Sequence, residues 1–321
     1  MRKPPFLNRR SLLVVGSGIT AGAFLGTRPA HADVPDSARF DLPGDGGNPI
    51  LKKSLGHNWV LQSLAYDNAH QHIYFAEVEP GSKTGDLWIT KTDTEGKILG
   101  SMKLRGFGHG VAIAAEPYDG AVYLWTEWQA SASGFGTKIG RFKFVNGGVL
   151  EKTSSAIQDR TPSIGDIMIN PQPAIDPSTG RLLVRYKTGA DLPRIVAFNL
   201  SDARAGRLGS ANRLVERALP SRGSWGESNP FQGYTAYGRY AYLLEGKANG
   251  PSYITVVDLN DTGQSTVVNK WETTTGASLP GREPQGMAIW MHPTGPRLAF
   301  GFHSNTGGVR QATVFYKSEL V

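Results

Sequence analysis

The chain has 321 residues, of which 39% are hydrophobic and 19% charged, and it contains no cysteine. Disulfide frameworks and thiolate chemistry are therefore excluded, and the fold depends on its apolar core alone. The formal net charge is +7, but five basic residues and no acidic residue lie within residues 1–32. Subtracting those five leaves +2, which argues against nucleic-acid binding.

Residues 1–32 have the organisation of an export signal peptide. A basic start is followed by a short apolar stretch and by Ala30-His31-Ala32, a small-x-small cleavage site. The pair Arg9-Arg10 followed by Ser-Leu-Leu resembles the twin-arginine pattern of proteins exported in folded form, although Arg-Arg also occurs in general secretory signals. We therefore expect a secreted, extracytoplasmic protein, in solution or associated with the cell wall.

After the signal, residues 33–48 are rich in Asp, Gly and Pro, which predicts a flexible linker. Residues 49–321 are expected to form one folded domain. No segment after the signal reaches the roughly 18 to 20 consecutive apolar residues that a membrane-spanning helix needs, so no membrane span is expected.

Five similar segments recur along residues 49–321, and each has the pattern of two strands joined by a turn. Every segment begins with a polar residue beside Gly, Ser or Pro, and a third β-rich run follows each pair. The spacings between the polar positions are 47, 63, 60 and 53 residues, which fit four-stranded units with variable outer loops. The polar positions are Gln62, His109, Gln172, Gln232 and Gln285.

The fifth unit ends without a fourth strand, and the missing strand is found near the start of the domain. Residues 50–55 resemble the fourth strand of the first unit, so they can complete the last unit and close a ring. Closure removes an open sheet edge, which would otherwise promote aggregation. The sequence therefore predicts an all-β, five-bladed β-propeller whose last blade is completed by an N-terminal strand.

In such a propeller the innermost strands line a central channel, so the five polar positions would form a ring on one face. The Gln amides can hydrogen-bond between blades or contact a ligand. His109 is the candidate for catalysis or ligand contact, because it departs from the repeat and is flanked by Gly108 and Gly110. The alternative is a tight strand entry that requires glycine.

A second set of side chains falls near the ends of the second strands, and these residues either pair with one another or line a cleft. Its members are Glu77, Glu127, Lys187, Glu245 and His303, with Arg185 close by. Aromatic residues at related positions offer flat faces for sugar rings, or pack in the core. The aromatic candidates are Trp125, Trp128, Tyr234, Tyr237 and Trp290, of which Trp125 and Tyr234 are the preferred ones.

Several stretches together carry a family resemblance, among them "DLWITKTDTEGKILGSMKLRGFGHGV", "FQGYTAYGRYAYLLEG" and "REPQGMAIW". They resemble the secreted actinobacterial proteins named teichoic acid biosynthesis protein C, whose propeller domain is shared with receptor-binding proteins of staphylococcal phages. The resemblance covers nearly all of residues 49–321. It implies recognition of anionic cell-surface glycopolymers, although the family name does not establish a chemistry.

Two classes of function remain open, besides a scaffold without a ligand. The first is a binding module for a wall glycopolymer or extracellular polysaccharide, in which Arg185, Lys187 and Arg282 would meet phosphate or uronate groups. The second is a carbohydrate-active enzyme: a lyase with His109 as base, or a hydrolase with Glu127 and Glu245 as its two acids.

No cofactor is expected, because the sequence contains no nucleotide-binding or hydrolase motif. No metal site is expected either. His70 and His72 have the spacing of a chelating pair, but they fall in a turn and lack a third ligand at readable spacing. We expect a monomer.

Overall fold

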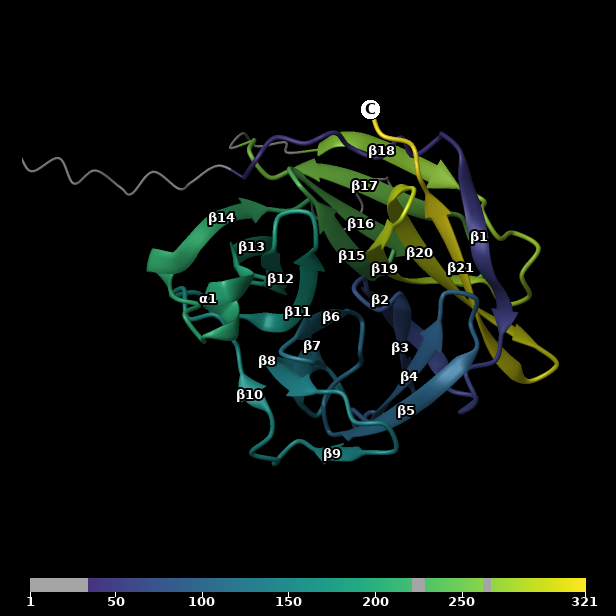
Figure 1. Ribbon diagram of the computed structural model, residues 1–321, viewed down its shortest axis with the longest axis horizontal. Coiled ribbons are helices and arrows are strands. Elements are labelled where there is room, and N and C mark those ends of the chain that lie inside the picture. Colours follow the sequence, from purple (N-terminus) through teal and green to yellow (C-terminus); the bar gives the residue numbers. More distant parts are fainter. Residues whose placement is uncertain (1–33, 221–228, 262–266) are drawn as a thin grey trace, which may run out of the picture. The chain divides into compact units, whose positions relative to one another are not determined.

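The computed structural model describes residues 34–220, 229–261 and 267–321, so the predicted signal peptide lies outside the described part of the chain. The described residues form five sheets arranged around a central axis, as Figure 1 shows. The prediction of a five-bladed β-propeller is confirmed. Apolar side chains pack between neighbouring sheets and form the core.

Each blade is built from four antiparallel strands, with the innermost strand at the axis. Blade one comprises β2 (Val60–Asp67), β3 (His72–Val78), β4 (Leu87–Asp93) and β5 (Ile98–Arg105). Blade two comprises β6 (Ile113–Tyr118), β7 (Ala121–Ala130), β8 (Gly136–Lys143) and β10 (Gln158–Asp159). Blade three comprises β11 (Ile169–Asp176), β12 (Arg181–Lys187), β13 (Pro193–Asn199) and β14 (Arg213–Ala218).

The remaining two blades follow the same plan. Blade four comprises β15 (Phe231–Tyr237), β16 (Tyr240–Gly246), β17 (Ser252–Asp258) and β18 (Val267–Thr273). Blade five comprises β19 (Glu283–His292), β20 (Gly295–Thr306), β21 (Val309–Lys317) and β1 (Gly46–Lys53).

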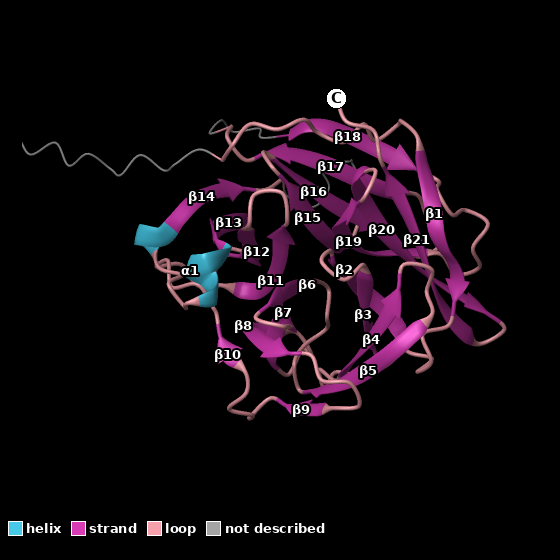
Figure 2. Ribbon diagram, viewed as in Figure 1, coloured by secondary structure: helices cyan, strands magenta, loops and turns pink. Residues whose placement is uncertain are grey.

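Three short elements lie outside the repeat. The strand β9 (Val149–Glu151) adds to the outer edge of blade one in parallel with β5. The helix α1 (Leu200–Arg204) and a single 3₁₀ turn (Ser210–Asn212) lie in the connection from β13 to β14, and Figure 2 shows how little of the molecule is helical. Within the described ranges, no helix has the length and apolar character to cross a bilayer.

The ring is closed by the pairing of β1 with β21. The two strands are antiparallel, with Ile50 opposite Val314 and Gly46 opposite Lys317. The Ile50 side chain is fully buried beside Val314 in the core of blade five, whereas Leu51 points to solvent. The closing strand predicted from the sequence is therefore present, and it begins earlier than residue 50.

The segment expected to be a flexible linker, 33–48, is packed on the propeller over its described part. Phe40 is fully buried among blade-four and blade-five side chains and forms a β-bridge with Leu320. Further upstream, the backbone N–H and C=O of Val34 both bond to the Asn260 side chain at 2.8 Å. The expectation fails because Phe40 and Val34 bury apolar surface on neighbouring blades, which composition alone does not reveal.

At the residue that follows a member of the predicted polar ring, neighbouring innermost strands come so close that their backbones are in contact. A Cβ placed on Gly233 would lie 2.8 Å from Cα of Gly286, and one on Gly286 would lie 2.5 Å from Cα of Ser63. Further round the ring, the Ser63 hydroxyl donates to the carbonyl of Gly110 at 2.6 Å. The small residue beside each of these ring positions is therefore required by contact between blades.

The pairing of β1 with β21 predicts that substitutions at two adjacent positions of β1 change the free energy of unfolding by very different amounts. Ile50→Ala should lower the free energy of unfolding by about 2 to 4 kcal/mol, because it removes a fully buried side chain from the blade-five core. Leu51→Ala, at an exposed position of the same strand, should change it by less than about 0.5 kcal/mol. Urea denaturation of both variants measures the difference, and equal stabilities would contradict the closure.

Candidate ligand-binding site

The five polar positions at the starts of the innermost strands line one cavity of about 540 Å³. The four Gln side chains are at most 7% exposed, whereas His109 is partly exposed to the cavity. Loops that follow the second strand of a blade also contribute side chains to the cavity. In an antiparallel meander, the end of the second strand lies on the same face as the start of the first strand. The ring members are Gln62, His109, Gln172, Gln232 and Gln285.

Two of the Gln amides take part in bonds that hold the site together. Gln172 Oε1 accepts from Arg185 Nη1 at 2.9 Å within blade three. Gln232 Nε2 donates to the carbonyl of Gly246 at 2.9 Å and to Glu283 Oε1 at 3.2 Å, which joins blades four and five. In contrast, Gln285 Oε1 is buried and has no hydrogen-bond partner among the described residues. The ring members therefore differ in how far their side chains are engaged by the protein itself.

The glycines around His109 are explained by the carboxylate of Glu127. A Cβ on Gly108 would lie 2.5 Å from Cδ of Glu127, and Glu127 accepts backbone N–H bonds from Gly110 at 2.6 Å and Gly136 at 2.5 Å. Gly110 also has a φ of +77°, which favours glycine. The "GHG" sequence is therefore a tight turn folded over a buried carboxylate, and His109 is the residue that this turn presents to the cavity.

Burial raises the pKa of Glu127 to about 7, against the opposing effect of its backbone N–H bonds. Burial also lowers the pKa of His109 below its usual value, which favours the neutral imidazole. The His109 ring lies 4.9 Å from the ring of Phe135, measured between centroids. His109 is therefore placed to present a neutral ring at the cavity wall, while Glu127 supports the turn from beneath.

Basic and aromatic side chains line the blade-three side of the cavity. The guanidinium of Arg185 lies 3.7 Å above the ring centroid of Phe231, and Lys187 pairs with Asp191 at 2.5 Å. Arg185, Lys187 and Phe231 also line an adjoining cavity of about 190 Å³ that includes Glu245. The two cavities therefore share one basic and aromatic wall.

Several predicted site residues are buried in structural roles. The Trp125 indole donates to Glu116 at 3.0 Å, and the Tyr234 hydroxyl donates to the carbonyl of either Gln172 or Leu183. Arg282 donates to the carbonyl of Thr275 and to Ser252, 2.7 Å in each case.

Four members of the second predicted set lie away from the main cavity, whereas Lys187 lines it. Glu77 is 2% exposed and accepts from Thr90, while burial and then Arg310 lower the pKa of His303 to about 4. Glu127 is enclosed by backbone N–H groups, and Glu245 faces the adjoining cavity. The structure therefore does not bring Glu127 and Glu245 together as the facing acids of a hydrolase.

The sequence analysis missed part of the cavity wall, because loops supply it. Lys83 comes from the connection between β3 and β4, and Phe135 from the connection between β7 and β8. The signal that indicates them is topological: in a meander blade, the loop between the second and third strands lies on the same face as the start of the first strand. Asn170 and two acidic residues, Glu79 and Glu283, also belong to the lining that the sequence did not indicate.

The fold and this cavity define a five-bladed β-propeller with a polar depression at the start of its innermost strands. The phage 5-bladed β-propeller receptor-binding platform domain matches residues 60–314, and the chain belongs to that family.

The relatives agree with this assignment. The chain is 28% identical over 290 residues to the Putative major teichoic acid biosynthesis protein C of Bacillus subtilis (strain 168), a match that covers 86% of this chain and 63% of that protein. The resemblance seen in the sequence is confirmed, and the chain spans less than two thirds of that relative.

One solved structure supports the fold. The tail fiber of Staphylococcus aureus phage P68 has a TM-score of 0.69 and 21% identity, covering 87% of this chain and 54% of the fiber. An α-L-arabinofuranosidase from Lactobacillus brevis reaches a TM-score of 0.48 at 10% identity, covering 81% and 92%, which is too distant to indicate glycoside cleavage.

The buried carboxyl of Glu77 predicts a pH-dependent stability. Burial raises its pKa to about 7 from 4.5, so the native state keeps this proton over a pH range in which the unfolded state loses it. The contribution of Glu77 to stability is full below pH 4.5 and declines as the pH rises to about 7. Glu77→Gln should therefore gain stability relative to the parent protein across that range, by roughly 2 to 3 kcal/mol in total.

Urea denaturation of both proteins at a series of pH values between 4.5 and 8 measures this effect. Glu95→Gln, at an exposed turn, controls for the loss of one carboxylate. A stability difference that stays constant with pH would contradict the assignment.

Proposed function

We propose that this propeller binds an anionic cell-surface glycopolymer, one that carries phosphate or uronate groups, through the cavity at the start of its innermost strands. The observation that carries the proposal is the convergence of the whole Gln and His ring with basic and aromatic side chains on one cavity. Its volume, about 540 Å³, falls in the range typical of ligand sites.

The side chains of the cavity match the groups of such a polymer. The Gln side chains of the ring carry amide donors and acceptors, which suit sugar hydroxyls. Lys83 and Arg185 supply positive charge for phosphate or carboxylate, and Phe135 and Phe231 supply apolar ring faces. The adjoining cavity on the same wall favours an extended ligand over a single sugar.

The relatives support the same substrate class. The Bacillus relative is named for teichoic acid biosynthesis, and the matched family is described as a receptor-binding platform. Teichoic acids are anionic glycopolymers, and receptor binding needs recognition of the polymer but no bond cleavage. A binding module on a wall polymer outside the cytoplasm, acting as a monomer and without a cofactor, is therefore the function that we propose.

A second candidate, polysaccharide lyase, is favoured by the state of His109. Burial keeps its imidazole neutral, so the ring can accept a proton, and the Gln172–Arg185 pair in the same cavity can neutralise a uronate carboxylate. Isothermal calorimetry with poly(glycerol phosphate), polygalacturonate and neutral dextran, followed by ultraviolet detection of unsaturated products, separates the candidates. Binding of anionic polymers without products supports the module, unsaturated products support the lyase, and no preference over dextran contradicts both.

Removing one cavity charge should weaken polymer binding. Lys83→Ala should lower the affinity for the anionic polymer about five-fold at low salt, roughly 1 kcal/mol, because one favourable charge is lost at the cavity edge. The effect should shrink at high salt. Lys97→Ala, an exposed lysine in the turn between β4 and β5, should bind like the parent. Equal affinities of the two variants would contradict an anionic ligand in this cavity.

Replacing His109 by the residue of the other four blades tests its special role. His109→Gln should change the free energy of unfolding by less than about 1 kcal/mol, since the Glu127 turn depends on backbone bonds. We expect weaker polymer binding or, if lyase activity is found, turnover reduced about 100-fold. Thermal melting, calorimetry and product formation are measured beside the control Gln172→His. Parent-like values in all three would leave His109 a structural residue.

A further inference from the structure

The opposite end of the central channel holds a second cavity that shares no lining residue with the first. Its volume is about 210 Å³, and all five innermost strands contribute to its wall. The wall is mainly apolar, and small side chains keep the axis open. Ala65, Ala114, Ala115, Ala174 and Ala288 are the alanines of this wall.

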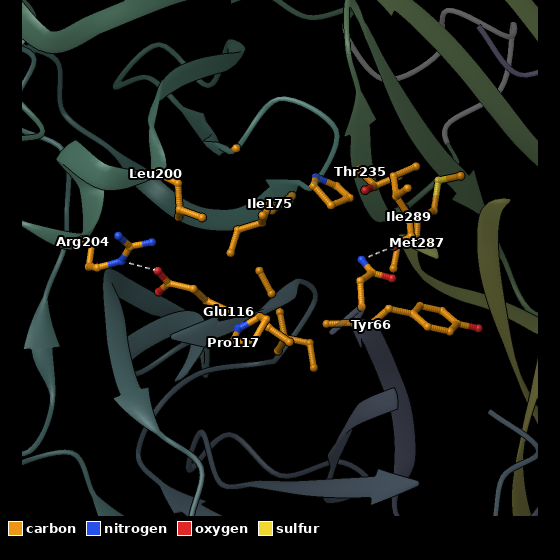
Figure 3. Close-up of a pocket in the computed structure, with 18 residues that line it drawn as sticks. Tyr66, Glu116, Pro117, Ile175, Leu200, Arg204, Thr235, Met287 and Ile289 are labelled. Carbon is orange, nitrogen blue, oxygen red and sulfur yellow. Dashed lines mark hydrogen bonds and ion pairs between the residues drawn. The ribbon is translucent and has the colours of Figure 1, made fainter. Parts of the chain in front are cut away.

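Two charged residues lie in this mainly apolar wall, Glu116 and Arg204, and they pair with each other. Arg204, at the end of α1, is 27% exposed and lies in the cavity wall with Leu200 and Ile175. Figure 3 shows the Arg204 guanidinium beside the cavity, bonded to Glu116 through one nitrogen, with its two terminal nitrogens turned toward the Leu200 side. Those two nitrogens make no hydrogen bond to any residue of the described ranges. Two N–H groups on one edge match the two oxygens of a carboxylate.

The local charge favours an anion. The Glu116 carboxylate is 2% exposed, and it accepts from Arg204 Nε at 2.6 Å and from Arg141 Nε at 2.7 Å. Two guanidinium groups therefore share one carboxylate, which leaves one positive charge uncompensated within this cluster. Arg160 adds a third guanidinium, which donates to the carbonyl of Arg204 at 3.0 Å. A cationic ligand would be repelled, and a neutral ligand would leave the terminal nitrogens of Arg204 without an acceptor.

We propose that this second cavity binds a small amphiphilic anion, a carboxylate attached to an apolar ring or short branched chain. The carboxylate is received by the terminal nitrogens of Arg204, and the apolar part lies against the alanines, Ile175 and Leu200. The volume sets the size, because an apolar cavity of about 150 Å³ already holds benzene and this one is somewhat larger. This site is independent of the glycopolymer cavity and stands even if that proposal fails.

Fluorine NMR titration of the purified protein tests the proposal, with 4-(trifluoromethyl)benzoate as probe and 4-(trifluoromethyl)benzyl alcohol as its neutral counterpart. The acid should bind at least about ten-fold more tightly than the alcohol. Arg204→Gln should abolish that preference, because it removes the guanidinium that receives the carboxylate. Arg207→Gln is the matched control: its side chain is 58% exposed and pairs with Asp202 outside the cavity, so the preference should remain.

A second variant tests the role of the cavity volume separately from the role of the Arg204 charge. Ile175→Trp should fill the cavity and weaken both probes about ten-fold or more, while leaving polymer binding at the other face unchanged. Equal affinity of acid and alcohol for the parent protein would overturn the proposal without any variant. It would also be overturned if Arg204→Gln kept the preference for the acid, or if Ile175→Trp bound both probes as the parent does.

Discussion

The close backbone approach of neighbouring innermost strands is the constraint on which the rest of the structure depends. The glycines at 233 and 286 leave no room for a Cβ, and Ser63 bonds directly to the next blade. These contacts join the innermost strands of blades four, five and one, and they join blade one to the turn that precedes blade two. Each small residue directly follows a member of the polar ring, and the side chains of all five ring members line the same cavity. The position of this cavity therefore follows from the way in which the blades contact one another.

The repeat in the sequence was sufficient to predict the fold, the closing strand and the membership of the ring. A repeat reports which positions are equivalent, and equivalent positions in a propeller lie at the same height on the axis. It does not report the direction of a side chain within its blade. Trp125 and Tyr234 occupy expected positions but pack against the neighbouring blade; the indole donates to Glu116 of its own blade, and the phenol bonds to blade three. Their burial depends on residues far along the chain, which no local pattern contains.

Tertiary contacts account for the other differences between the predicted and the observed roles of residues. Glu127 has the residue type of a catalytic acid, yet its carboxylate is surrounded by N–H groups of the turn that carries His109. The residues before β1 have the composition of a linker, yet Phe40 completes the core between two blades. In both cases the deciding partner is supplied by tertiary structure. The same holds for Lys83 and Phe135, which reach the cavity from loops whose course only the blades define.

The pairing of β1 with β21 has a consequence for how the chain is made. β1 ends at Lys53 and its partner begins at Val309, so the first strand is synthesised long before the last. At ribosomal rates of about 5 to 20 residues per second, roughly 13 to 50 seconds separate the two. Until then the Ile50 side chain lacks its blade-five neighbours, such as Val314, and the fifth blade lacks its outer strand. Ring closure therefore has to wait for the synthesis of β21, and a nascent chain interrupted before β21 would carry an open sheet edge that a chaperone or a second nascent chain can bind.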